Sequence, residues 1–436
     1  MLNRGGSRTI YKLRKRKHAL NWNKSSIGTR QQCIRSLSVK VNTIPRIDEL
    51  HSEMTEWRRD FHMNPELAFE EVRTSNIIAE KLESWGIQVS RNLAKTGVVG
   101  TLQGNKTLPV GSSVQSIGLR ADMDALPMEE LNDFHYRSRV PGKMHGCGHD
   151  GHTTMLLGAA QYLAETRNFG GTVHFIFQPA EEDGGGGGVM VEEGLFKKFP
   201  CDQIYGMHNW PLLPVGQISV RAGPIMGSSD EFDIKITGKG GHAAIPNQTI
   251  DPIFVASQVI VALQGAVSRV SDPVKPSVLS VTKINAGSAY NVIPDTATLA
   301  GTVRTLDEDT RSTMNEMLHN VTRSVVEGFG ATCTIDLKEG YPVTSNAKEA
   351  TEFASEVATS VFGSENVFAD IEPTMGAEDF SYMLKETPGC YVWIGQGITD
   401  DDHMVHHPLY DFNDAVLPIG ASYFVKLVEE GLKPSL

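Results

Sequence analysis

Buried strands that alternate with helices constrain the fold of this 436-residue chain more than any other feature. Short apolar runs with strand character occupy residues 98–102, 116–121, 172–177 and 203–207, and turn residues follow them. Residues 153–165, between two of these runs, have a helical pattern with small and apolar residues on one face. Such alternation is typical of a mostly parallel, twisted sheet flanked by helices. We therefore expect an α/β fold.

A second pattern interrupts the first between residues 226 and 339. Its order is strand, helix, two strands, helix and strand, which predicts a ferredoxin-like α+β domain inserted into the larger one. The six expected elements cover residues 231–236, 252–270, 277–284, 296–304, 308–329 and 332–338. The predicted parts of the chain are a basic leader at 1–44, the larger domain at 45–225 and 340–436, and the inserted domain at 226–339. Outside the insertion, helices are also expected at 47–61, 70–85 and 347–362, and a strand at 390–395.

The charge of the chain is distributed unevenly. Residues 1–47 contain twelve Lys or Arg and no Asp or Glu, whereas the whole chain has a net charge of −12, so the remainder is close to −24. A leader of this composition predicts a mitochondrial transit peptide, and a cytoplasmic protein is the alternative. A disordered basic tail, or a nuclear or anionic-surface patch, would have the same composition.

Composition also excludes several classes of protein. The acidic body argues against nucleic acid as a partner. The apolar runs fall short of the length that spans a bilayer, which argues against a membrane protein. Five widely spaced cysteines are too few and too scattered for a disulfide scaffold.

Potential metal ligands gather in residues 144–152. This stretch contains three histidines, the thiol of Cys147 and the carboxylate of Asp150. Soft and borderline ligands in such density suit a transition metal rather than calcium or magnesium. A polar loop with incidental histidines is the alternative interpretation, and residues elsewhere in the chain decide between the two.

Further candidate ligands follow the ends of other strands or lie in a later loop. Glu181 and Glu182 follow the strand at 172–177, His208 follows the strand at 203–207, and His407 lies in a polar loop near the C-terminus. Open α/β sheets gather their chemistry at the carboxyl ends of the strands. These groups suffice for one or two ions with open positions for water, and either Glu181 or Glu182 could be a general base.

Seven motifs in one order make the chain resemble the M20 metallopeptidase family. Within it, the chain is most similar to the amidohydrolase branch, which includes hippurate hydrolases, N-acyl-amino-acid amidohydrolases and the plant indole-acetyl-amino-acid hydrolases. The resemblance covers about residues 47–430. The motifs are residues 62–67, 119–127, 144–150, 178–182, 206–208, 375–380 and 406–408.

The resemblance implies a zinc-peptidase-like catalytic domain with two divalent metal ions: manganese, zinc or cobalt. The implied metal ligands are Cys147, His149, Glu182, His208 and His407. Glu181 looks like the general base, and Asp124 looks like its supporting carboxylate. The wider family usually has histidine at position 122 and an aspartate as bridging ligand. These departures characterise the amidohydrolase branch.

The inserted domain looks like the dimerisation or lid domain of the family, so a homodimer through this domain is expected. His242 matches a histidine that helps to polarise the scissile carbonyl, and Asn291 and Arg304 are candidates for binding the substrate carboxylate. The implied reaction is hydrolysis of the amide of a small N-acyl amino acid, such as an acetyl or benzoyl derivative. The alternatives are a dipeptidase or carboxypeptidase of the same family and a non-catalytic binding protein.

Overall fold

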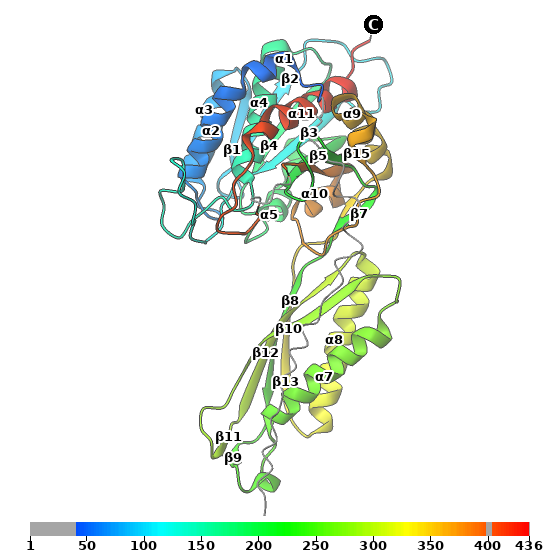
Figure 1. Cartoon of the computed structure of the whole chain (residues 1–436). Helices are drawn as coiled ribbons and strands as arrows, with labels where there is room; N and C mark the ends of the chain where they lie inside the picture. Colours follow the sequence, from blue (N-terminus) through cyan, green and yellow to red (C-terminus); the bar gives the residue numbers. More distant parts are fainter. Residues whose placement is uncertain (1–40, 398–402, 436) are drawn as a thin grey trace, which may run out of the picture. The chain divides into compact units, whose positions relative to one another are not determined.

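The computed structural model describes residues 41–397 and 403–435, so nearly all of the predicted basic leader lies outside the described residues. Its large sheet has eight strands in the order β1-β2-β4-β3-β5-β16-β6-β15 (Figure 1). Strands β4, β3, β5 and β16 pair in parallel, and β1 and β2 form an antiparallel edge. The sheet is therefore mostly parallel, as the alternation of elements predicts. The strands are β1 (Gln88–Leu93), β2 (Gly97–Gln103), β3 (Ser116–Asp122), β4 (Thr172–Gln178), β5 (Gln203–Trp210), β6 (Ile218–Ser219), β15 (Val367–Phe368) and β16 (Gly389–Gly395).

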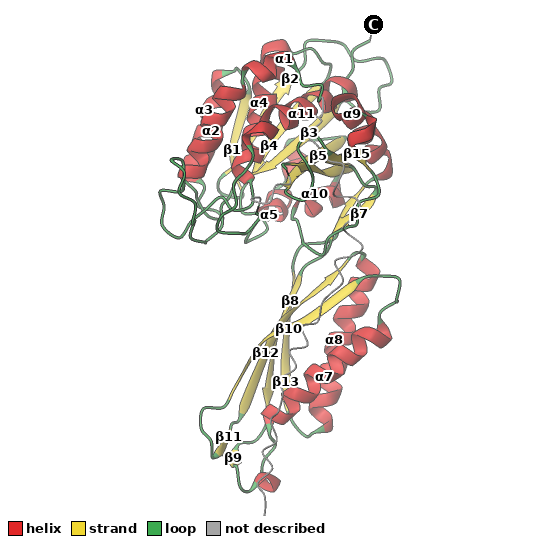
Figure 2. Ribbon diagram, in the orientation of Figure 1, coloured by secondary structure: helices red, strands yellow, loops and turns green. Residues whose placement is uncertain are grey.

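Helices cover both faces of this sheet (Figure 2). One face packs against six helices: α1 (Pro45–Glu49), α2 (His51–Met63), α3 (Val72–Ser84), α4 (His149–Thr166), α9 (Lys348–Phe362) and α11 (Leu417–Gly431). The other face, here called the site face, packs against α5 (Gly186–Glu192), α6 (Leu195–Lys198) and α10 (Phe380–Glu386). Successive residues of a strand point to opposite faces of the sheet. Because helices cover both faces, the side chains on both sides of a central strand are buried.

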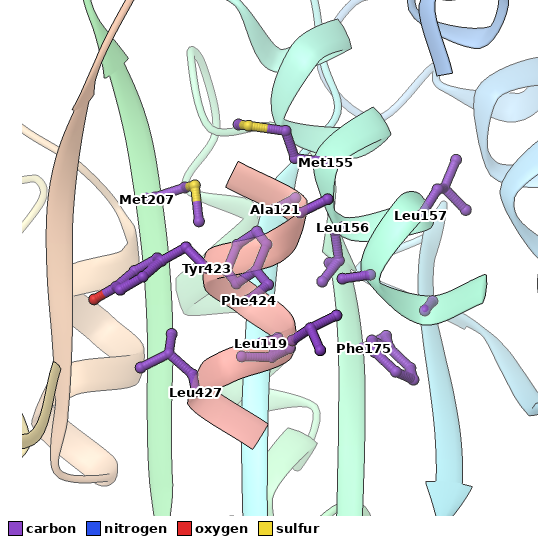
Figure 3. Packing of buried hydrophobic residues seen from close by; sticks show 14 of the residues in the cluster. Leu119, Ala121, Met155, Leu156, Leu157, Phe175, Met207, Tyr423, Phe424 and Leu427 are labelled. Atoms are coloured by element: carbon purple, nitrogen blue, oxygen red, sulfur yellow. The ribbon is translucent and has the colours of Figure 1, made fainter. Parts of the chain in front are cut away.

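The core opposite the site face forms where α4 and α11 pack on β3, β4 and β5 (Figure 3). Leu119 and Phe175 from the strands lie against Leu156 of α4 and Phe424 of α11, and all four side chains are buried. Apolar side chains packed in this way contribute about 1.5–3 kcal/mol each. This packing fixes the strand ends, and the polar residues that follow them, in space.

The second sheet belongs to the inserted segment and is wholly antiparallel, in the order β10-β12-β8-β13. Its strands are β8 (Asp230–Thr237), β10 (Ser277–Ala286), β12 (Thr296–Thr305) and β13 (Thr332–Glu339), and its helices are α7 (Pro252–Val270) and α8 (Glu308–Gly328). Both helices have side chains in the hydrophobic core of this sheet. The element and strand orders are those of a ferredoxin-like unit.

The remaining elements are short. They are β7 (Gly223–Met226) paired with β14 (Thr344–Asn346), β9 (Gly241–His242) paired with β11 (Val292–Ile293), and the 3-10 turns η1 (Pro246–Gln248), η2 (Ser364–Asn366) and η3 (Asp414–Val416).

Several local expectations need correction. The helix expected at 47–61 is two helices that meet at Leu50, and the helix expected at 153–165 already begins at His149. Helix α11 was not expected, although most of its residues are buried. By length and composition α7 is apolar enough to cross a membrane, contrary to the expectation, although Val255, Val259 and Leu263 pack into the core of its own sheet.

Candidate metal centre

Two of the predicted ligands, Cys147 and His149, lie at the start of α4, on either side of its N-cap residue Gly148. Gly148 has φ of +100°, and a Cβ at this position would lie 2.2 Å from Oδ1 of Asn209. Only glycine tolerates both the left-handed backbone and this close approach. The turn therefore directs Cys147 and His149, which are 7% and 0% exposed, into the same buried site.

Asp124 orients His149 and the neighbouring Glu182. Its Oδ1 lies 3.1 Å from Nδ1 of His149, and its Oδ2 accepts a hydrogen bond from the backbone N–H of Glu182 at 3.0 Å. Burial opposes protonation of His149, but Asp122 and Asp124 outweigh it and raise the pKa of His149 to about 10. Asp124 therefore contacts two predicted ligands, and its charge is also among those that raise the pKa of Glu181, its predicted partner.

Two buried ligand atoms in this site have no hydrogen-bond partner among the described residues. They are Nε2 of His149 and Oε1 of Glu182, which lie 3.9 Å apart. An unpartnered polar atom in a protein interior costs about 1–3 kcal/mol. A cation between these two atoms would remove that cost, so both atoms fit a metal site.

His208 points its free ring nitrogen at Cys147. Its Nδ1 donates a hydrogen bond to the backbone carbonyl of Asn209 at 2.7 Å, which leaves Nε2 as the acceptor atom. This Nε2 lies 3.3 Å from Sγ of Cys147. Burial and the nearby His152 lower the pKa of His208 well below its usual range, so its ring is neutral, as a metal ligand must be.

The structure brings His406, rather than the predicted His407, to this site. Nε2 of His406 lies 3.3 Å from Oε1 of Glu182. The His407 ring instead stacks on His403, with ring centroids 4.2 Å apart, and its Nδ1 accepts a hydrogen bond from the backbone N–H of Leu409.

The backbone at His406 explains this difference. His406 has φ of +66°, and its N–H donates to the carbonyl of Gly146 at 2.7 Å, which fixes the loop beside the start of α4. His407 is the residue before Pro408, and such a residue is restricted to an extended backbone. The position before proline is the one local difference between the two histidines, and the contact with Gly146 decides which of them reaches the site.

Glu181 lies beside the ligands, and its carboxylate is only weakly hydrogen-bonded. The Asp379 N–H approaches Oε1 at 3.4 Å, and the hydroxyl of Tyr341 donates to the Glu181 backbone carbonyl at 2.5 Å. Burial, then the nearby carboxylates of Glu378 and Glu182, raise the pKa of Glu181 well above its usual range. A buried carboxyl group with a raised pKa is suited to accepting and returning a proton.

Behind Glu181, the buried Arg120 holds three carboxylates, a role that the sequence analysis did not predict. Its guanidinium donates to Asp122 at 2.7 Å, to Glu378 at 2.8 Å and to Asp379 at 2.9 Å. Arg120 is 1% exposed. A charged residue in an otherwise buried strand needs such partners, and this was the available signal.

The donor atoms form overlapping groups that suit divalent metal ions. The groups, each with ligand atoms within 4.8 Å of one another, include Cys147 with His149 and His208, Cys147 with Glu182 and His406, and His149 with Glu181 and Glu182. Because Cys147 and His149 each belong to two groups, more than one ion could share these ligands. Burial and Glu182 raise the pKa of the Cys147 thiol, so a cation is required to stabilise its thiolate.

A cavity of about 940 Å³ opens onto these residues. Its lining includes Cys147, Glu181, Trp210 and Tyr341, together with Arg304 from the inserted segment. Nη1 of Arg304 donates a hydrogen bond to the carbonyl of Met375 at 3.3 Å. His242 and Asn291 are not among the lining residues, and both are exposed, on or beside the paired strands β9 and β11.

Comparison with known proteins agrees with this geometry. Residues 118–430 match the family described as Peptidase family M20/M25/M40. The hippurate hydrolase of Campylobacter jejuni is 42% identical over 90% of this chain and 100% of its own length, and thermostable carboxypeptidase 2 of Saccharolobus solfataricus is 41% identical over 80% and 87%. A crystal structure of the Bacillus subtilis YXEP protein, described as a dinuclear metal-binding peptidase from the M20 family, is 35% identical with a TM-score of 0.76, covering 88% of this chain and 99% of that one. The chain therefore belongs to the peptidase family M20/M25/M40, in its amidohydrolase branch, and is a metal-binding hydrolase of amide bonds.

Proposed function

We propose that this protein hydrolyses N-acyl amino acids to a carboxylate and a free amino acid. The observation that carries the proposal is the position of Glu181, a buried carboxyl group beside the metal ligands and on the wall of a cavity that also contains Arg304. Glu181 supplies the base that the reaction needs, and the guanidinium of Arg304 suits the carboxylate of the amino acid.

Two divalent ions are part of this proposal, with zinc, manganese and cobalt as the candidates. Bound at these ligands, divalent ions would lower the pKa of water and polarise the acyl carbonyl. Glu181 takes the proton of the attacking water and returns it to the departing nitrogen. Asp124 and the Asn209 carbonyl keep the rings of His149 and His208 in the tautomers that leave Nε2 free.

Replacing Glu181 by glutamine tests the role of the base. The variant should bind metal as the parent does and lose about 10²- to 10⁴-fold in kcat, because it cannot accept a proton. Glu192→Gln is the matched control, since Glu192 lines the same cavity but belongs to none of the groups of potential ligands, and it should retain activity. Unchanged turnover in Glu181→Gln would refute the assignment.

A pair of neighbouring histidines tests the ligand set. We expect His406→Ala to lower the metal content measured by mass spectrometry and to reduce turnover, because it removes one potential ligand from the group that His406 forms with Cys147 and Glu182. His407→Ala, one residue away and exposed, should keep both. The opposite result, with metal lost only in His407→Ala, would restore His407 as the ligand.

Two rival functions are distinguished by substrate and by turnover. A dipeptidase or carboxypeptidase of this family would cleave dipeptides faster than acetyl- or benzoyl-amino acids with the same C-terminal residue. A binding protein would bind these compounds and cleave none. The complete set of ligands together with Glu181 supports an enzyme.

A homodimer through the inserted domain is part of the proposal. Helix α7 has no charged residue between Pro252 and Ser268, and its outer face exposes Phe254 by 50% and Val261 by 68%. Neighbouring β10 pairs only with β12 among the described strands, so one edge of it is open. An uncharged face beside an open strand edge favours pairing with a second copy.

The exposed His242 and Asn291 support a role for that second copy, because neither lines the cavity of its own chain. We propose that each copy supplies His242 to the site of the other. Mixing Glu181→Gln with His242→Ala chains should then regain activity, since a mixed dimer has one site with both residues intact. Inactive mixed dimers would contradict this arrangement.

A further inference from the structure

Trp210 lies on the same face of β5 as the ligand His208. The two residues are separated by one position in the strand, so their side chains point the same way, about 7 Å apart along it. The Trp210 ring stacks on that of Trp393 in β16, with centroids 4.2 Å apart and an angle of 6° between the planes. Trp393 is 1% exposed, and Trp210 lines the cavity. The buried ring therefore holds a partly exposed aromatic surface beside the metal site.

We infer that Trp210 is a specificity-determining residue that binds the acyl group and makes the enzyme prefer aromatic acyl groups to acetyl. This inference rests on the proposed function. An aromatic ring joined directly, or through one methylene, to a carbonyl carbon at the ligands would reach the Trp210 ring. Offset stacking of two aromatic rings is favourable beyond the burial of their surface, and an acetyl methyl group cannot make it.

The placement of Glu181 assigns Trp210 to the acyl half of the substrate rather than to the amino acid half. Glu181 shares a ligand group with His149 and Glu182, whereas His208 shares one with His149 and Cys147. His149 thus belongs to both ligand groups, whereas Glu181 belongs to one of them and His208 to the other. Since Glu181 protonates the departing nitrogen, the amino acid half extends to the Glu181 side. The acyl half then extends to the side of His208 and Trp210.

Charge along the cavity agrees with this orientation. Tyr341, which hydrogen-bonds the Glu181 backbone, follows closely after Lys338, and Lys338 and Arg304 both line the cavity. Their strands β13 and β12 flank β8 in the sheet. Tyr341 therefore connects Glu181 to the cavity wall that carries these two cations, together with Glu231 and Glu339, and the amino acid carboxylate would lie at this wall. The indole surface of Trp210 is on the His208 side.

The test compares benzoyl-glycine with acetyl-glycine in the metal-loaded enzyme and two variants. We expect the parent to prefer benzoyl-glycine, and Trp210→Leu to lower kcat/KM for it by roughly 10- to 100-fold while changing acetyl-glycine by less than about threefold. Trp210→Phe keeps a ring and should recover most of the preference. Equal losses on both substrates would overturn the inference, because they would indicate a general effect on His208.

Two further measurements separate the possible failures. The ratio of kcat/KM for acetyl-phenylalanine to that for acetyl-glycine reports on the amino acid half of the substrate. If Trp210→Leu lowered only this ratio, Trp210 would contact the amino acid side chain and not the acyl group, and the inference would be wrong. Binding of benzoate and acetate to the metal-loaded Glu181→Gln protein needs no turnover. If benzoate binds more tightly than acetate, and Trp210→Leu abolishes this difference, the inference is supported. This holds even if the parent cleaves no N-acyl amino acid, because that result would refute only the proposed function. Equal binding of benzoate to the Glu181→Gln protein with and without Trp210→Leu would overturn the inference.

Discussion

Replacing His62 by glutamine should remove a contribution to stability that depends on pH. His62 is fully buried on α2, with Nδ1 at 2.8 Å from Asp150 and Nε2 at 3.1 Å from Glu130. Burial alone would lower the pKa of His62, but the hydrogen bonds to these two carboxylates outweigh it and raise the pKa from 6.5 to about 9. A difference of this size corresponds to about 3 kcal/mol in favour of the folded, protonated form.

The pH range in which His62 stabilises the protein follows from the direction of its pKa shift. Because the folded-state pKa is the higher one, the contribution is complete below pH 6.5, is lost as the pH rises and is absent above about pH 9. For a cooperative unit of this size, 3 kcal/mol corresponds to a change of about 4 °C in Tm. We therefore expect the difference in Tm between the parent and His62→Gln to shrink by about that amount between pH 6 and pH 10.

The assay is thermal unfolding of the metal-saturated protein across this pH range, followed by circular dichroism. His174→Gln is the matched control. His174 is also buried, but burial lowers its pKa to about 4, and its ring bonds the hydroxyl of Thr101 rather than a carboxylate. Its effect on Tm should be constant above about pH 7.5 and should change only slightly, and in the opposite direction, between pH 7.5 and pH 6. A constant difference for His62→Gln as well would refute the reasoning, because it would mean that His62 is neutral in the folded chain.

Two other substitutions test the packing behind the site. Arg120→Met should cost about 3–5 kcal/mol and reduce turnover, because it leaves buried carboxylates without their cation; a fall in Tm no larger than that of an exposed Arg→Met variant would contradict this. Gly186→Ala should lower both Tm and activity, because its Cβ would lie 1.8 Å from the carbonyl oxygen of Pro179. The matched Gly328→Ala, with nothing within 4 Å and a helical backbone, should instead raise stability by about 0.5–1 kcal/mol.

The five glycines at 184–188 illustrate a question that the sequence left open. Such a run fits either a mobile loop or a segment packed tightly against its surroundings. The structure has the second arrangement, in which Gly187 donates a hydrogen bond to Asp379 and a Cβ at Gly188 would lie 3.1 Å from the Tyr382 ring. Composition alone could not distinguish the two, because the neighbours that require glycine come from residues almost 200 positions later.

The strand ends were predictable because their signal is local. A buried apolar run and the polar residue that follows it are adjacent in the sequence, so Asp122, Glu181 and His208 could be assigned to one edge of a sheet. The bounds expected for α7, residues 252–270, are also those of the structure. There the N-cap Asp251, the proline after it and a continuous apolar helix agree with one another.

The start of α4 was less predictable because packing determines it. Its first turn contains His149 and Asp150, which read as part of a loop, and its cap is a glycine without a side chain to mark it. At Gly151, a Cβ would lie 2.3 Å from the Phe412 ring. A residue more than 250 positions away thus requires glycine in the first turn of this helix, the turn that also contains His149.

The choice between His406 and His407 shows why the ligand set needs long-range contacts. The two residues are chemically identical and adjacent, so ligand preference cannot separate them. The separation comes from a backbone hydrogen bond between His406 and Gly146, together with the left-handed backbone at His406. The same bond ties the C-terminal loop to the turn that carries Cys147. A pattern of side chains describes what a site can bind, whereas this main-chain bond determines which of two equal side chains reaches it.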